Sequence, residues 1–338
     1  MIWLLLALTS APVHPGAPPR GQPAAGDTVP PVLTLPDPAL DDTAGYHGYA
    51  TRFYRDAAGD AVQVYLDHRL GRVVNVWADA LDESIGFTVR DSGSANAAVT
   101  WASSGAAPGP AGAFRTLSYR LDLGSPTATI GLFLLGSMRV ERDFHYAFRD
   151  SLPFDSVAFR EPELTTLIQD LGGLPDAERK NELAILGATN TATLTARLGP
   201  ALALNQRRRG WALRVDQVSF DGRRHLRLTI AGDPGTTAVW ADSGLAIRVS
   251  GPGAAKVIVT IATDAPALTP VPRGEMFNED FRRFYARVAA DTSHPVRIRR
   301  LEREVRGAEL LTYREKVMAG LPNYATYFGR DGLMTALM

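Results

Sequence analysis

The residue types best suited to chemistry lie together near the end of the sequence, in residues 324–338 (YATYFGRDGLMTALM). Arg330 and Asp331 are adjacent and opposite in charge, and Tyr327 and Phe328 come shortly before them. A planar guanidinium and a carboxylate offer several fixed donors and acceptors to a polar ligand. The two residues could therefore form a ligand-binding pair.

The same segment also has a purely structural interpretation. Four apolar residues that follow the charged pair fall on one helical stripe: Leu333, Met334, Leu337 and Met338. Asp331 stands where such a helix would begin, and there its carboxylate would cap free backbone N–H groups and be favoured by the helix dipole. Helix capping and ligand binding both remain open from the pattern alone.

The stretch LTYREKVMAGLPNYATYFGRDGLMTALM, from Leu311 onward, resembles the start of the catalytic domain in six-hairpin glycosidases. These (α/α)6-barrel enzymes include glucoamylases and bacterial glycogen-debranching enzymes. The resemblance implies that Arg330 and Asp331 bind hydroxyls of the sugar in the subsite where the bond is cut, with Tyr327 and Phe328 walling the pocket. It covers roughly thirty residues, a tenth of the chain.

Glycoside hydrolysis generally needs two carboxylates that flank the scissile bond, about 6.5–9.5 Å apart when the reaction inverts the anomeric centre. The resemblance places both in loops later in the barrel, so we assign no catalytic residue in this sequence. We expect the N-terminal part of a glycoside hydrolase acting on an α-linked glucan or related oligosaccharide, itself inactive, and belonging to an enzyme that inverts without a required metal.

Ahead of this segment the sequence is dominated by short strand patterns. Residues 62–67 alternate with period two, and residues 71–77 follow after a turn, which predicts a hairpin. Many such strands, separated by Gly-, Asp-, Ser- and Pro-rich turns, predict a mainly β fold with a large antiparallel β-sandwich over residues 45–272. A helical insertion is expected at residues 161–187.

The family resemblance extends to this order of elements. It implies a supersandwich over residues 45–272, a helical linker over residues 273–320 and the first helix of a truncated (α/α)6 barrel over residues 321–338. The linker pattern itself predicts one amphipathic helix with acidic residues in its first turn from about Gly274, and a second, Arg-rich helix over residues 296–312.

The N-terminal residues predict export. Residues 1–25 hold a short apolar run followed by small residues, which is typical of a secretory signal peptide and too short to span a membrane. Residues 26–44 are Pro-rich and predict an unpacked tether, with the folded part starting near Tyr46. We therefore expect a secreted or periplasmic protein with no membrane contact beyond this leader.

Composition narrows the possible partners. The 36 basic and 36 acidic residues balance, so nothing indicates a nucleic-acid surface. There are no cysteines, and the six histidines are spaced too far apart for a helical metal pair, so we expect neither a metal site nor a cofactor. The expected partner is an oligosaccharide or polysaccharide substrate.

Two alternatives stay open. The first is a secreted, non-catalytic β-sandwich module that binds carbohydrate or a partner protein, with Trp101 and Trp240 as candidate stacking residues. Trp77 and Trp211 lie inside alternating strands, which favours core packing for both. The second is a sugar-modifying sandwich enzyme of mutarotase type, because a fold class does not fix a function.

Overall fold

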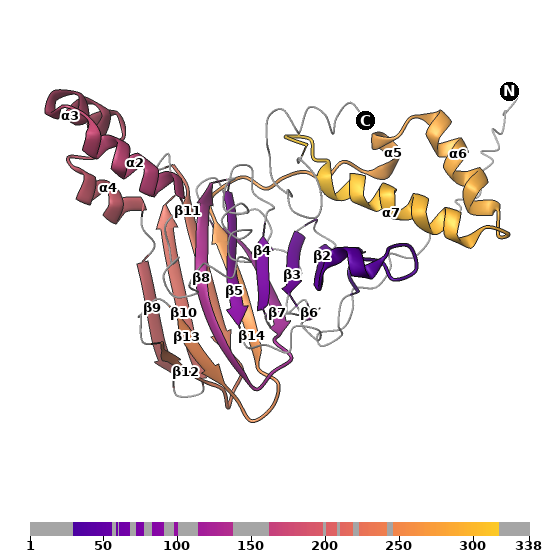
Figure 1. Cartoon of the computed structure of the whole chain (residues 1–338), viewed down its shortest axis with the longest axis horizontal. Helices are drawn as coiled ribbons and strands as arrows, with labels where there is room; N and C mark the ends of the chain where they lie inside the picture. Colours follow the sequence, from indigo (N-terminus) through magenta and orange to yellow (C-terminus); the bar gives the residue numbers. More distant parts are fainter. Residues whose placement is uncertain are drawn as a thin grey trace, which may run out of the picture.

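The computed structural model of the chain describes residues 30–55, 59, 61–67, 72–77, 83–90, 98–100, 114–137, 162–198, 201–207, 210–218, 223–241 and 246–317. Over these residues the protein is mainly β, and every strand pairing is antiparallel. The strands lie in the middle of the molecule, with one helical group at either side (Figure 1).

The strands form two sheets. The eight-stranded sheet has the order β1-β2-β3-β4-β5-β8-β13-β12, with bounds Leu33–Leu35, Tyr49–Arg55, Ala61–Asp67, Arg72–Trp77, Glu83–Arg90, Thr127–Ser137, Ile247–Ser250 and Thr237–Trp240. The six-stranded sheet has the order β6-β7-β14-β11-β10-β9, with bounds Ala98–Thr100, Arg115–Asp122, Lys256–Thr263, His225–Gly232, Gly210–Val218 and Ala201–Arg207. The predicted hairpin is confirmed as the pair β3 and β4.

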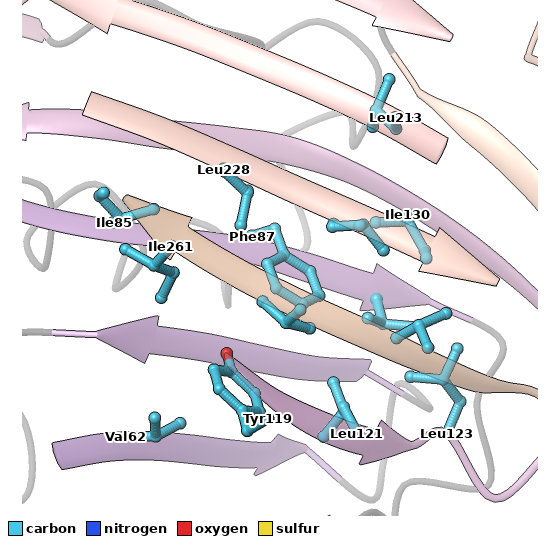
Figure 2. Packing of buried hydrophobic residues seen from close by; sticks show 14 of the residues in the cluster. Val62, Ile85, Phe87, Tyr119, Leu121, Leu123, Ile130, Leu213, Leu228 and Ile261 are labelled. Atoms are coloured by element: carbon cyan, nitrogen blue, oxygen red, sulfur yellow. The ribbon is translucent and has the colours of Figure 1, made fainter. Parts of the chain in front are cut away.

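Buried side chains of both sheets meet in one hydrophobic core. The alternating sequence pattern explains it: β7, β11 and β14 each bury every second residue, so one face of the sheet is apolar. Figure 2 shows Phe87 of β5, Tyr119 of β7 and Ile261 of β14 within this core. Phe87 and Tyr119 are fully buried.

The helical insertion between β8 and β9 is longer than predicted. It holds α2 (Pro162–Gly173), α3 (Asp176–Ile185) and α4 (Thr191–Leu198) rather than ending near residue 187. Leu171, Leu183 and Leu194 form a small core of their own within it. The third helix was not predicted because its sequence, TATLTARL, is rich in threonine, a weak helix former.

The N-terminal segment is also more ordered than predicted. Residues 26–44 were expected to be an unpacked tether, but within them β1 pairs with β2 and Leu33 is buried. A 3-10 helix, Thr43–Tyr46, follows, with the Asp42 side chain accepting from Ala44 N. The prediction that the folded part begins near Tyr46 is therefore wrong, and the order comes from pairing with β2 rather than from a local pattern.

After β14 the chain forms α5 (Arg273–Met276), α6 (Glu279–Ala290) and α7 (Pro295–Leu311). The single helix expected from about Gly274 is divided in two. Phe277 is extended, and Asn278 caps α6 by accepting a hydrogen bond from Phe281 N. The Arg-rich helix predicted over residues 296–312 agrees closely with α7.

Candidate functional site

The four residues predicted to bind substrate, Arg330, Asp331, Tyr327 and Phe328, lie outside the described residues. The described part of the chain ends at Val317, ten residues before Tyr327. The structure does describe the residues that precede this segment and the contacts that hold them to the rest of the protein. We refer to residues 269–273 and 309–317, together with Arg55, as the junction.

Backbone and side-chain hydrogen bonds hold the two halves of the junction together. Pro270 and Tyr313 form an antiparallel bridge, and Arg314 N donates to Thr269 O at 2.9 Å. The Glu315 carboxylate accepts from Thr269 N at 2.8 Å and from Thr269 Oγ1 at 2.7 Å. The segment leading to Val317 is therefore fastened to the chain that leaves the last strand.

Arg55, at the end of β2, links the junction to the eight-stranded sheet. Its Nη2 donates to the Tyr313 hydroxyl at 2.5 Å, and its Nη1 donates to Glu309 O at 3.3 Å. Tyr313 is buried and belongs to a small apolar cluster that also includes Leu33, Phe53, Leu268 and Leu310. The segment that follows α7 is therefore attached to the eight-stranded sheet both by burial of Tyr313 and by hydrogen bonds from Arg55.

Arg273, the first residue of α5, connects to two glutamates of α7. It donates to both oxygens of Glu309 at 2.6 and 2.8 Å, and to both oxygens of Glu302 at 3.1 and 3.3 Å. Glu302 also accepts from Tyr285 of α6 and from Arg306 Nε, the latter at 2.9 Å. Such shared, bidentate contacts fix the geometry more firmly than isolated surface pairs do.

These contacts change the protonation properties of the network. Burial raises the pKa of the Glu302 carboxyl, but hydrogen bonds from Tyr285, Arg273 and Arg306 outweigh it, so this pKa lies below its ordinary value of 4.5. The hydrogen bond to Glu302, with burial, raises the pKa of the Tyr285 hydroxyl. The hydrogen bond to Glu309 leads the effects that raise the pKa of Arg273. The lowered pKa keeps Glu302 ionised as a counter-ion of Arg273, which suits anchorage and not proton transfer.

The N-terminal segment binds α7 through arginines that neighbour Glu302 on the helix surface. Both oxygens of Asp37 accept from Arg299 at 3.0 Å, Asp41 pairs with Arg303, and Arg306 Nη1 donates to Val32 O at 3.2 Å. A groove of about 420 Å³ lies between this segment and α7, lined by Pro31, Val32, Leu33, Thr34, Asp37, Pro38, Arg299, Glu302, Arg303 and Arg306. Since its charged residues are paired with one another, we assign it no ligand.

A histidine and an aspartate meet at one end of the six-stranded sheet. His225 Nδ1 lies 2.9 Å from Asp264 Oδ2, and His225 N donates to Asp264 Oδ1 at 2.7 Å. Burial raises the pKa of the Asp264 carboxyl. The hydrogen bonds from His225 lower this pKa by more than burial raises it, so the pKa lies below its ordinary value. The residues are 39 positions apart, and no spacing rule could have joined them. We interpret the contact as fixing the start of β11.

The two tryptophans whose side chains the structure describes differ in burial: Trp211 is buried and Trp240 is exposed. Trp211 is buried at 1% exposure and donates from Nε1 to Thr236 Oγ1 at 3.1 Å, which confirms its predicted place in the core. Trp240, at the end of β12, keeps 39% of its surface exposed, and its neighbour Val239 keeps 58%. Trp101 and the side chain of Trp77 are outside the described part.

Within the described ranges, no cluster of His, Cys, Asp or Glu could hold a metal ion. Among the helices of that part, none is both long and apolar enough to cross a membrane. Comparisons with models of known protein families and with curated proteins find no match for this chain.

Proposed function

We propose that this chain is the N-terminal part of an exported glycoside hydrolase that acts on an α-linked glucan or related oligosaccharide. In this proposal the two antiparallel sheets form a supersandwich, α5 to α7 form the helical linker, and residues 321–338 begin an (α/α)6 barrel. Arg330 and Asp331 bind substrate hydroxyls beside Tyr327 and Phe328. The catalytic carboxylates belong to later sequence, so the 338 residues alone hydrolyse nothing.

The junction is the observation that supports this role best. A β domain that positions a following catalytic domain needs a rigid connection between its sheets, the linker helices and the Tyr-Phe-Gly-Arg-Asp segment. Arg55 and Arg273 both stabilise this connection, Arg55 by contacting Tyr313 and Arg273 by contacting Glu309. A freely hinged linker would not need a bidentate contact between α5 and α7.

The test compares two proteins made from the same source DNA: the 338-residue chain and the product of the whole reading frame that contains it. Hydrolysis of maltooligosaccharides is followed by release of reducing ends. We expect turnover from the product of an extended frame only, and a loss of roughly 10- to 100-fold in kcat/KM in Asp331→Asn, because a hydrogen bond to a charged group contributes roughly 1.5–3 kcal/mol.

Arg283→Ala is the matched control, since this arginine lies exposed on α6 and pairs only with Glu279 and Asp280 of the same helix among the contacts described. Its activity should equal that of the parent. Turnover by the 338-residue chain, an inactive extended product or a stop codon directly after Met338 would each contradict the proposal.

The exposed Trp240 and Val239 favour a second candidate, a non-catalytic carbohydrate-binding module. In that case the 338-residue chain binds maltooligosaccharides by itself, and calorimetry detects the heat of binding. Trp240→Ala should then abolish it, because stacking on a sugar needs the exposed indole face. Binding that is absent, or that persists in Trp240→Ala and Trp101→Ala, counts against a stacking platform on the sheets.

A further inference from the structure

Three phenylalanine rings form an aromatic ladder at the start of α6. Phe281 and Phe284 are three positions apart on one face of the helix, and Phe277 is the extended residue between α5 and the N-cap of α6. The first two rings are stacked with centroids 4.4 Å apart, and the second and third are tilted at 6.1 Å. The ladder is a continuous apolar strip and not a set of scattered rings.

Neither α7 nor the sheets bury this ladder. No residue of α6 is buried, and Phe284 keeps 44% of its surface exposed, whereas α7 buries Val305 and Leu310. The contact from α6 to α7 runs through the polar pair Tyr285 and Glu302. Figure 1 shows α6 at the outer end of the helical group, away from the strands. Phe277 and Phe281 are half-buried and Phe284 is exposed, so the apolar face of this amphipathic helix is only partly covered, which is typical of a contact surface.

The chain itself passes close to the ladder. Arg314 Nη2 donates to Glu275 Oε2 at 2.6 Å, and Glu275 is two residues before Phe277. The described chain ends at Val317, three residues after Arg314, so residues 318–338 follow closely on this contact in the sequence. That segment carries nine large apolar or aromatic residues that match an aromatic strip: Met318, Leu321, Tyr324, Tyr327, Phe328, Leu333, Met334, Leu337 and Met338.

Length and tethering both favour this occupant. Successive ring centroids of the ladder are 4.4 and 6.1 Å apart, whereas 21 residues of chain can extend up to about 70 Å. A segment tethered this closely reaches an effective concentration of about 1 mM or more, so modest apolar contact is enough to hold it. The segment has only two charged side chains, Arg330 and Asp331, next to one another, and therefore little to desolvate.

We propose that residues 321–338 pack the apolar stripe of Leu333, Met334, Leu337 and Met338 on the ladder formed by Phe277, Phe281 and Phe284. The ladder is then an intramolecular docking surface that orients the segment leaving the junction. This inference uses the anchorage described above but not the glycosidase assignment, and it is measured without any activity assay. Its failure and the failure of the proposed function are therefore distinguishable.

The absence of cysteine from the sequence allows a direct test by paired cysteines in the 338-residue chain. Val288→Cys lies on the ladder face, one turn beyond Phe284, and leaves all three rings in place. It is combined with Leu333→Cys in one protein and with Leu337→Cys in another. A disulfide requires Cα atoms within about 7 Å, so a short bismaleimide is used alongside mild oxidation. Ala286→Cys, exposed on the opposite face of α6, replaces Val288→Cys in the matched controls.

We expect an intramolecular cross-link to form at least about tenfold faster from Val288→Cys than from Ala286→Cys, since tethering alone gives both positions similar effective concentrations. Equal rates, or no cross-link with either reagent, would overturn the proposal. A cross-link found mainly between two chains would also overturn it, because a second copy would then cover the ladder.

Hydrogen exchange provides an independent readout. In Phe281→Ser/Phe284→Ser, peptides from residues 321–338 should exchange faster than in the parent, while α2 to α4 and the strands stay unchanged. Arg283→Ser, on the polar side of the same helix, is the control and should leave the exchange of residues 321–338 as it is. Unchanged exchange in the double variant contradicts the proposal even if the cross-linking were ambiguous.

Discussion

The double-sheet core and the helical group at the junction are held together in different ways. In the core, Phe87, Tyr119 and Ile130 are fully buried, and both sheets contribute to one apolar cluster. In the helical group, α6 buries nothing and the contacts between helices run through Arg273 and Glu302. The core is stable through desolvation of its own surface. The helical group buries Val305 and Leu310 of α7, but it joins α5 and α6 to α7 by polar contacts and leaves Phe284 exposed.

The largest expected difference between the two regions comes from removing a phenylalanine. Phe87→Ala leaves a cavity in the core and should lower the free energy of unfolding by about 3–5 kcal/mol. Phe284→Ala removes a ring that is already 44% exposed and should cost less than about 1 kcal/mol. Urea unfolding followed by circular dichroism measures both, and similar losses would show that the helical group is packed as tightly as the sheets.

A smaller effect is expected from adding a single methyl group at Gly232. A Cβ there would lie 2.2 Å from both Trp211 Nε1 and Thr236 Oγ1, between two groups that are hydrogen-bonded to each other. Gly232→Ala should therefore destabilise the core by about 1–3 kcal/mol through overpacking. Gly253→Ala is the control, because no atom lies within 4 Å of its added Cβ. Unchanged urea midpoints for Gly232→Ala would mean that this corner of the core has room to relax.

The smallest effect is a loosening of the junction in acid. Because the folded-state pKa of Glu302 is below 4.5, its contribution is complete above that pH and is lost as the pH falls through the folded-state value. Backbone exchange at residues 312–317, corrected for its intrinsic pH dependence, should rise in this window, while exchange in β14 stays constant. Glu302→Gln should exchange faster at neutral pH and lose most of the pH dependence. A parallel rise in β14 would indicate global unfolding instead.

The sequence carried enough information for much of the sheet region. Period-two alternation predicted the hairpin of β3 and β4, and many similar patterns predicted a mainly β fold, because a strand with one buried face must alternate. β9 was not predicted, because its alternation is short: only Leu202 and Leu204 are bulky and apolar, and the rest of the strand is alanine or polar. β1 was not predicted either, because three residues between prolines give no pattern until β2 is beside them.

The junction could not be predicted in the same way. Arg55 and Tyr313 are separated by 258 positions, and Arg273 and Glu309 by 36, so their pairing follows from tertiary structure alone. The Arg-rich character of α7 predicted an exposed helix face. It did not predict that Arg299 and Arg303 bind the N-terminal segment while Glu302 and Glu309 bind α5. Composition indicates that charges are present, but only the fold decides their partners.

The position of α7 between the two ends of the described chain has a mechanical consequence. Residues 32–41 bind one side of α7 through Val32, Asp37 and Asp41, and the chain leaves toward Val317 from its C-terminal end. Tension applied between residues 30 and 317 would therefore load α7, β1 and their ion pairs first. The remaining strands do not lie on the line between the two points of force. The contacts between α7 and residues 32–41 would therefore break before the strands of the sheets separate.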